Sequence, residues 1–233
     1  MSSLVLIPSF NERESVLQSI IRQIRTLTSS SILIVDDGSE NPCNTNALDV
    51  DYILRHQKNK GYGKSLIDGF NFAIRNDFCA VVTIDGDGQH DPTLIPTFLN
   101  ALNRCNIVNG TRHSDASKIL TPLPEKWGWD NKIITDLLNS HFDLGITDST
   151  CGYRAYTISS LERLKPTIYG YGIAVQILAK AGILGLVIRE VPIPVMYFST
   201  RRKFKGIMST REGALRYHRS IIARELRKGA MPG

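Results

Sequence analysis

The sequence predicts an α/β fold in which a mostly parallel central sheet is flanked by helices. Short apolar runs alternate with helical patterns through the first half of the chain, and this alternation is typical of a parallel sheet. Polar clusters follow directly on three of the apolar runs, where sheets of this class bind ligands. The chain has 233 residues and no repeat or low-complexity linker, so we expect a single domain over 1–233.

The first half, residues 1–110, supplies most of the predicted sheet. The predicted strands are Leu4–Ile7, Ile32–Val35, Tyr52–Leu54, Ala80–Ile84 and Ile107–Asn109. Apolar residues recur at helical spacing over 16–27, where Asn11 and Glu14 resemble a capping box. A second helical face covers 66–74, and Pro92 suits the first turn of a third helix.

The second half, residues 111–233, is less regular. We expect helices over Lys132–Phe142, Ile173–Ala181 and Glu212–Lys228 and a strand over Val187–Tyr197. Two prolines in that strand suit the edge of a sheet. The final helix is basic and has apolar residues on one side, so we expect it to pack on the core, with a lipid surface as the alternative. Trp127 and Trp129 are candidates for an interface anchor, an acceptor pocket or plain packing.

Composition excludes several classes of protein. Hydrophobic residues make up 42% and charged residues 21% of the chain, which is ordinary for a globular protein and not for a disordered chain or a coiled coil. We expect no signal peptide and no transmembrane span. The four cysteines form no CxxC pair, so zinc and a disulfide framework are not expected, and a reducing cytosol is.

Positive charge is concentrated near the C-terminus. Residues 199–233 contain ten Lys or Arg and two Asp or Glu, whereas the whole chain carries +6. Such a segment suits nucleic acid, an anionic membrane surface or a phosphorylated ligand, or it is simply a solvated helix face.

The polar clusters are Pro8–Glu12, Asp36–Ser39 and Asp85–Asp91. In a parallel sheet they lie at one edge, where their carboxylates repel one another unless a cation is bound. Asp85 and Asp87, with glycines between and after them, can turn onto one hard cation, and Gln89 can add an oxygen. Mg²⁺ or Mn²⁺ suits such ligands together with substrate phosphates. The glycine- and lysine-containing loop Lys58–Lys64 opens a helix and can receive phosphate, although it is not a Walker A loop.

Seven motifs together resemble a known family. In chain order they are Pro8–Glu12, Asp36–Ser39, Asn59–Gly63, Asp85–Gln89, Gly110–Arg112, Asp148–Arg154 and Arg189–Val195. They resemble the inverting glycosyltransferases of family 2, which have the Rossmann-like GT-A fold, and among them most closely the polyprenyl-phosphate (dolichol-phosphate) sugar synthases. The resemblance covers roughly residues 4–205.

The resemblance implies a role for each matching position. Residues 1–110 would bind the nucleotide sugar and 111–233 the acceptor. Donor binding would fall to Pro8, Asn11, Glu12, Asp36, Asp37, Gly61, Lys64, Asp85, Gly86, Asp87 and Gln89, with Asp85, Asp87 and Gln89 holding Mg²⁺ or Mn²⁺. Phosphates of donor or acceptor would meet Arg112, Arg154, Arg201, Arg202 and Lys203. Asp87, Asp148 and Arg154 would be catalytic.

The chain also departs from the family pattern. Gly170–Gln176 lacks the two carboxylates of the usual G-[FY]-E-x-x-x-E helix, and Thr200–Lys205 replaces the usual R-x-x-G-x-S-K turn. We expect none of the membrane helices that many relatives carry after the core. These departures concern the acceptor half.

The expected reaction is transfer of a sugar from a UDP- or GDP-sugar to an acceptor, with inversion. A polyprenyl phosphate is already ionised near neutral pH and needs no strong base. A hydroxyl acceptor would need one, and Asp148 is the candidate. The alternatives are a family-2 transferase acting on a soluble or saccharide hydroxyl and a non-catalytic polyanion-binding module. A nucleotidyltransferase is disfavoured because Leu6–Glu12 lacks a glycine-rich loop. We expect a cytoplasmic protein, in peripheral contact with the membrane through its basic end, and no nucleic-acid partner.

Overall fold

A computed structural model describes the chain except for residues 1, 45–46, 124–127, 198–205 and 230–233. Its centre is a seven-stranded sheet with the strand order β3-β2-β1-β4-β6-β5-β7. The strands are β1 (Ser3–Ser9), β2 (Ser31–Asp36), β3 (Tyr52–Arg55), β4 (Ala80–Thr83), β5 (Ile107–Thr111), β6 (Arg154–Thr157) and β7 (Ile188–Pro192). The mostly parallel sheet of the sequence prediction is confirmed.

Strand β6 accounts for both antiparallel pairings. It runs antiparallel to β4 and β5, whereas β1, β2, β3 and β4 pair in parallel, as do β5 and β7. Strand β5 therefore points the same way as β4, so that the carboxyl ends of β1, β2, β4 and β5 share one edge of the sheet. The proline-containing strand β7 is at the edge of the sheet, as predicted.

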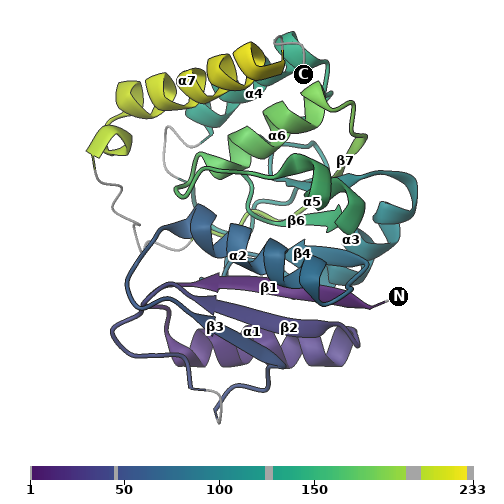
Figure 1. Ribbon diagram of the computed structural model, residues 1–233, viewed down its shortest axis with the longest axis vertical. Helices are drawn as coiled ribbons and strands as arrows, with labels where there is room; N and C mark the ends of the chain where they lie inside the picture. The colour runs from purple at the N-terminus through teal and green to yellow at the C-terminus, as the bar shows by residue number, and fades with distance from the viewer. Residues whose placement is uncertain (1, 45–46, 124–127, 198–205, 230–233) are drawn as a thin grey trace.

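Helices cover both faces. They are α1 (Glu14–Leu27), α2 (Tyr62–Arg75), α3 (Ile95–Ala101), α4 (Trp129–Phe142), α5 (Ile158–Leu164), α6 (Ile173–Ile183) and α7 (Arg211–Gly229), with a 3₁₀ turn at Pro92–Leu94 before α3 and others at Leu102–Arg104 and Gly206–Ser209. Alternate residues of β1 enter different cores. Val5 and Ile7 pack with α1 and α3, whereas Leu4 and Leu6 pack with α2 and the helices beyond it. Figure 1 shows α1 and α2 on opposite faces of the sheet.

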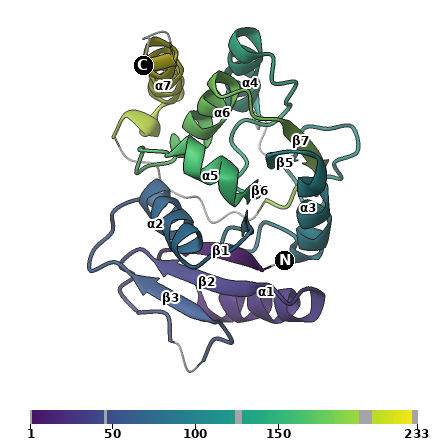
Figure 2. The ribbon, with the colours of Figure 1, turned by 45° about the vertical axis from the view of Figure 1, so that its right-hand side comes forward.

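The basic helix α7 packs on the protein. Figures 1 and 2 both show it beside α6 and α4, far from β3. Ile221 and Ile222 are buried in the core cluster of α2 and α6, and Leu215 and Leu226 pack against it. This confirms packing on the core in preference to lipid for the apolar side of α7. Among the described residues, no helix is long and apolar enough to cross a membrane.

Candidate active site

The first two polar clusters interlock at the carboxyl ends of β1 and β2. Asn11, which has a φ of +55°, donates its backbone N–H to Ser39 Oγ at 2.9 Å. Its side-chain Oδ1 accepts from the backbone N–H of Glu40, also at 2.9 Å. Because Asn11 is engaged in this way it does not cap α1, whose N-cap is Arg13 without a side-chain hydrogen bond. The predicted capping box is therefore wrong, and Asn11 joins two loops.

Asp36 and Asp37 are buried and shape the loops around them. Asp36 accepts from the backbone N–H groups of Ser39 and Cys43 and, at 2.7 Å, from Arg55. Its carboxylate is buried among these donors, so this residue holds the loop that follows β2.

Asp37 fixes the loop predicted to receive phosphate. It accepts from the backbone N–H groups of Lys60 and Gly61, each at 2.8 Å, and contacts His56 Nδ1 at 2.6 Å. His56 Nε2 reaches Asp68, which also pairs with Lys64. Burial alone would raise the pKa of Asp68, but hydrogen bonds from Lys64 and His56 hold that pKa below its usual value. Lys64 is thus a paired cation at the start of α2.

The third cluster lies against the first. A Cβ on Gly86 would be 3.4 Å from the carbonyl oxygen of Pro8 and 3.5 Å from Glu12 Cγ. Asp87 accepts at 3.0 Å from both the backbone N–H and the side-chain amide of Gln89. The structure therefore places Gly86, between the two carboxylates of the third cluster, against Pro8 and Glu12, as the parallel sheet predicts.

Asp85 faces two segments from elsewhere in the chain. Tyr62 at the start of α2 donates its hydroxyl to Asp85 Oδ1 at 3.0 Å. A Cβ on Gly152 would stand 3.0 Å from the same oxygen, so the absence of a side chain at 152 makes room for this carboxylate. Asp85, Asp87 and Gln89 all line one cavity of about 890 Å³.

These donors fit a hard divalent cation. Two carboxylates and an amide oxygen are the ligands that Mg²⁺ and Mn²⁺ prefer, with the remaining positions left to phosphate and water. Within the part of the chain that the structure describes, no group of three or more His, Cys, Asp or Glu residues is arranged to hold a metal. Asp85, Asp87 and Gln89 would leave coordination positions of such an ion open to a substrate.

The cavity extends from the sheet edge to α4, α6 and α7. Its lining includes Tyr62, Asp85, Asp87, Gln89, His90, Arg112, Asp130, Asn131, Ile134, Thr150, Gly152, Tyr171, Ala174, Met196, Tyr197, Met208, Ser209, Thr210, Arg211, Ala214 and His218. It is acidic at the carboxyl end of β4 and contains Arg112 and Arg211 elsewhere. Such a cavity can accept an anionic ligand that also carries a cation.

Asp148 does not fit the predicted role of general base. Arg112 donates to both of its oxygens, from Nε at 2.7 Å and Nη2 at 3.0 Å, and Asn131 donates at 2.8 Å. The side chain is fully buried. Burial would raise the pKa of Asp148, but the charge and hydrogen bonds of Arg112 hold it well below its usual range. Asp148 is an anchor that orients Arg112 toward the cavity.

Arg154 does not fit the predicted phosphate contact. It is 1% exposed and donates to Asn109 Oδ1 at 2.7 Å, to the carbonyl of Ala174 at 2.9 Å and to that of Ser149 at 3.1 Å. It therefore ties β6 to β5 and α6 inside the protein. The predicted phosphate contacts Arg201, Arg202 and Lys203 lie outside the described residues, as do Trp127 and the side chain of Trp129.

Sequence reasoning missed two aromatic residues of the cavity. Tyr62 and Tyr171 stack with ring centroids 5.2 Å apart and an interplanar angle of 17°. Both lie between glycines in the sequence, and an aromatic residue between glycines was a signal that could have been followed. The contributions of α7 to the lining, such as Arg211 and His218, had no such signal.

The sequence of the chain is similar to those of known proteins. Residues 4–165 match the family described as Glycosyl transferase family 2. The chain is 29% identical over 204 residues to undecaprenyl-phosphate mannosyltransferase of Micrococcus luteus, covering 83% of each chain. It is 28% identical over 208 residues to polyprenol monophosphomannose synthase of Mycolicibacterium smegmatis, covering 82% of this chain and 76% of the relative.

A solved structure shows the same fold. The crystal structure of glucosyl-3-phosphoglycerate synthase from Mycobacterium tuberculosis, in complex with Mn²⁺, UDP and glucosyl-3-phosphoglycerate, matches with a TM-score of 0.70 at 20% identity. The match covers 100% of this chain and 81% of that one.

Proposed function

Because the chain belongs to glycosyl transferase family 2, we propose that it transfers a sugar from a UDP- or GDP-sugar to a polyprenyl phosphate, with inversion at the anomeric carbon. The observation that carries the proposal is the shared cavity, in which Asp85 and Asp87 lie at one side and Arg112 also lines the wall. The two curated relatives named above are described as enzymes of polyprenyl phosphates, which supports the acceptor class.

The donor half of the proposal rests on the acidic loop after β4. Asp85, Asp87 and Gln89 would hold Mg²⁺ or Mn²⁺, and the bound ion would supply Lewis-acid stabilisation of the leaving diphosphate. Tyr62 would keep Asp85 oriented through its hydroxyl. Pro8, Asn11 and Glu12 would border the nucleotide, with Asp36 and Asp37 acting through the loops that they hold.

The acceptor half rests on Arg112. Its guanidinium lines the cavity while Asp148 fixes it from behind, so it is oriented before an anionic ligand arrives. Fixed donors of this kind stabilise developing negative charge without reorganisation. A phosphate acceptor is ionised near neutral pH, so the reaction does not require Asp148 as a base, and the hydrogen bonds of Asp148 agree with that.

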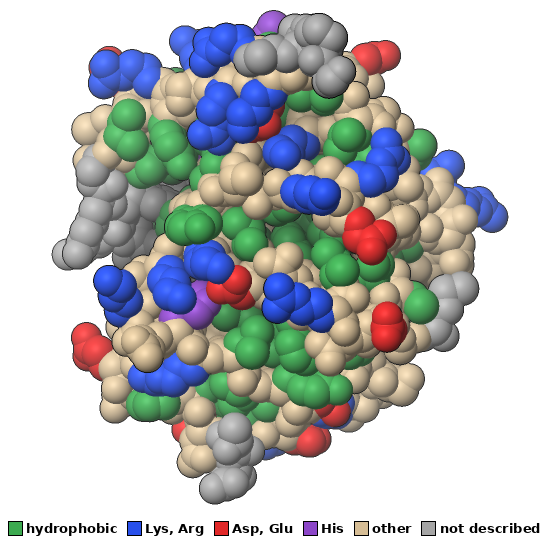
Figure 3. All heavy atoms as spheres, in the orientation of Figure 1, with side chains coloured by type: hydrophobic (Ala, Val, Ile, Leu, Met, Phe, Trp, Pro, Cys, Tyr) green, Lys and Arg blue, Asp and Glu red, His purple; other side chains and the backbone are tan. Residues whose placement is uncertain are grey.

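We also propose that the outer side of α7 contacts an anionic membrane on its cytoplasmic face. The outer basic residues of α7 are Arg216, Arg219 and Arg227, all exposed. Figure 3 shows Lys and Arg side chains gathered over this end of the molecule. Each cation near an anionic surface contributes about 1 kcal/mol.

Two measurements test the proposal. Calorimetry should show UDP or GDP binding that requires Mn²⁺ or Mg²⁺ and that is lost in Asp87→Ala, with Asp91→Ala, which retains the Asp85 and Asp87 pair, as the control. A panel of nucleotide sugars with and without polyprenyl phosphate, followed by mass spectrometry, should show transfer only when the lipid phosphate is present. Transfer to a sugar hydroxyl instead would refute polyprenyl phosphate as the acceptor. Metal-independent binding of polyanions would refute the proposal that the chain is an enzyme.

A further inference from the structure

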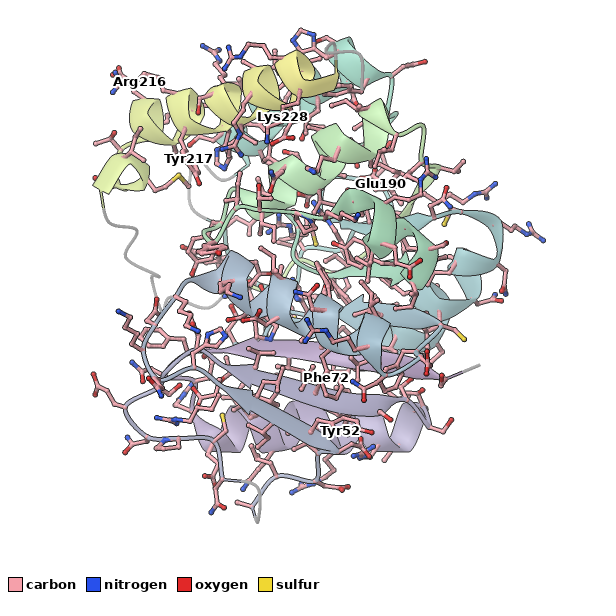
Figure 4. The ribbon with its side chains drawn as sticks, in the orientation of Figure 1. Tyr52, Phe72, Glu190, Arg216, Tyr217 and Lys228 are labelled. Carbon is pink, nitrogen blue, oxygen red and sulfur yellow. The ribbon has the colours of Figure 1, made fainter. Side chains whose placement is uncertain are left out.

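Helix α7 contacts a segment that supports the loop proposed to bind the donor. We call Lys58–Lys64 the donor loop and Thr167–Gly172, which precedes α6, the support segment. Tyr217 and Ile221 of α7 occupy the space where a side chain at 172 would stand, since a Cβ on Gly172 would lie 2.8 Å from Tyr217 Cε1 and would overlap Ile221 Cδ1. Figure 4 shows Tyr217 on the inner side of α7 and Arg216 on its outer side. The missing side chain at 172 therefore brings α7 onto the support segment.

A buried polar pair joins α7 to α6 at a second point. Glu225 is 2% exposed, and its Oε1 accepts from Gln176 Nε2 at 2.8 Å. Arg224 and Lys228 lie at 3.3 and 4.0 Å from the same carboxylate. The charge of Glu225 is thus matched by cations of its own helix, while its inward bond goes to a neutral amide.

Gln176 passes this contact on to the support segment. Its Oε1 accepts from the backbone N–H groups of Thr167 at 2.8 Å and Ile168 at 3.0 Å, and its Nε2 also donates to Thr167 Oγ1 at 2.9 Å. The side chain is fully buried, so each of these bonds would leave an unpaired polar group if broken. The side-chain amide of Gln176 therefore bridges Glu225 and the support segment.

The support segment in turn fits closely against the donor loop. Lys64 donates its backbone N–H to the carbonyl of Tyr169 at 3.1 Å. A Cβ on Gly61 would lie 2.5 Å from that carbonyl oxygen, and a Cβ on Gly63 would overlap the carbonyl of Ile168. Only glycines allow this approach, and any displacement of the support segment would move the donor loop with it.

The contact continues to the proposed metal site. Tyr171, at the end of the support segment, stacks on Tyr62, and Tyr62 donates to Asp85. A continuous set of contacts thus runs from α7 through α6 to the acidic loop after β4.

We propose that Glu225 and Gln176 are positioning residues that hold the donor loop in its binding conformation, so that α7 sets the affinity for the nucleotide donor. The inference rests on the proposed function, because it takes the donor loop as the nucleotide site. It goes beyond that function by giving the basic helix a role in donor binding as well as in contact with an anionic surface.

The amide and the carboxylate of this pair can be exchanged, which provides the test. In Gln176→Glu two carboxylates would meet in a buried site, and like charges there repel. In the double variant Q176E/E225Q the carboxylate introduced at position 176 can accept from Thr167, Ile168 and the amide introduced at position 225, so the bonding pattern is restored. Calorimetric titration with UDP or GDP and Mn²⁺ should show donor affinity about tenfold weaker in Q176E and close to wild type in the double variant.

A matched control separates donor positioning from lost stability. Ile222→Val trims a buried side chain of the same helix and leaves both members of the polar pair in place. It should lower the melting temperature and leave donor affinity unchanged. In turnover assays Q176E should raise the donor KM with little change in kcat.

Three results would overturn the inference. They are wild-type donor affinity in Q176E, no recovery in the double variant, and equal loss of affinity in I222V. Should Q176E be recovered unfolded, Glu225→Ala decides, since it removes the acceptor of Gln176 and should weaken donor binding in a folded protein. A wild-type chain that binds no nucleotide with Mn²⁺ overturns the proposed function and this inference with it, whereas normal wild-type binding with unaffected variants overturns this inference alone.

Discussion

Replacing Asp148 by Asn keeps the size of the side chain but removes its charge, and this change distinguishes a buried anchor from a catalytic base. The two oxygens of Asp148 accept from Arg112, Asn131 and the backbone N–H groups of Thr150 and Cys151. Every orientation of an Asn side chain would point its NH₂ group at one or more of these donors. The substitution therefore places one hydrogen-bond donor against another, and it also removes the ion pair with Arg112.

The expected loss of stability follows from burial. Breaking a buried ion pair from one side costs about 3–5 kcal/mol. The side chain of Arg112 is 26% exposed, so water solvates part of the cation once its partner is gone. We therefore expect D148N to lose about 3 kcal/mol of unfolding free energy, which lowers Tm by roughly 6–12 °C for a chain of this size.

The pH dependence has a defined sign. The folded-state pKa of Asp148 lies below its unfolded value, so its contribution is fully present above the unfolded pKa and is lost as the pH falls through the folded one. Wild type should lose this part of its stability as the pH falls below about 4. D148N lacks the group and should lose less over the same range.

Urea unfolding followed by circular dichroism, at neutral pH and at acid pH, measures both effects. Asp136→Asn is the control, because Asp136 pairs with Lys132 at the surface with both side chains exposed and should change stability by about 0.5 kcal/mol or less. A D148N protein with wild-type stability and no turnover would refute the anchoring role and restore Asp148 as a base.

Two further predictions concern the donor loop and the outer basic residues of α7. Gly63→Ala would place a methyl group against the carbonyl of Ile168, so the backbone of the donor loop or of the support segment would have to move. Calorimetry should then show Mn²⁺-dependent UDP or GDP binding weakened at least about tenfold. Unchanged affinity would show that the donor loop is not the nucleotide site. Substituting all three outer basic residues by Gln should remove about 3 kcal/mol of attraction to vesicles rich in phosphatidylserine, measured by co-sedimentation at low salt, without changing nucleotide affinity. Equal sedimentation of variant and wild type would place membrane contact elsewhere.

The sequence predicted most of the sheet because its strands are short apolar runs that end in polar clusters. It missed β6, which begins with Arg154 and has only four residues, so no apolar run marks it. Its antiparallel direction depends on pairing with β4 and β5, and long-range pairing of this kind leaves no local pattern.

Residue type alone was enough to predict that the carboxylates after β4 lie at one edge of the sheet. Two carboxylates separated by one glycine face a cavity because the chain turns there, and Asp85 and Asp87 do so. Whether a charged side chain meets a ligand or another part of the protein depends on its partners. Arg154 is enclosed by carbonyls from Ser149 and Ala174, which the spacing of residues could not indicate.

Glu190 and Asp148 are carboxylates that resemble catalytic groups, but both act to hold Arg112 in place. This residue of β7, labelled in Figure 4, accepts from the backbone N–H of Thr147 at 2.8 Å and from Asn109 at 2.9 Å, and Asn109 also donates to the carbonyl of Asp148. Glu190 thus holds the loop that carries Asp148, and Asp148 holds Arg112. Glu190 can therefore influence how an anion binds in the cavity, because it acts through Asp148 and Arg112. Glu190→Gln should accordingly raise the acceptor KM more than it changes donor affinity. The donor loop lies near the β3 end of the sheet, whereas β7 is at the opposite end, and the described residues show no hydrogen bond between the two.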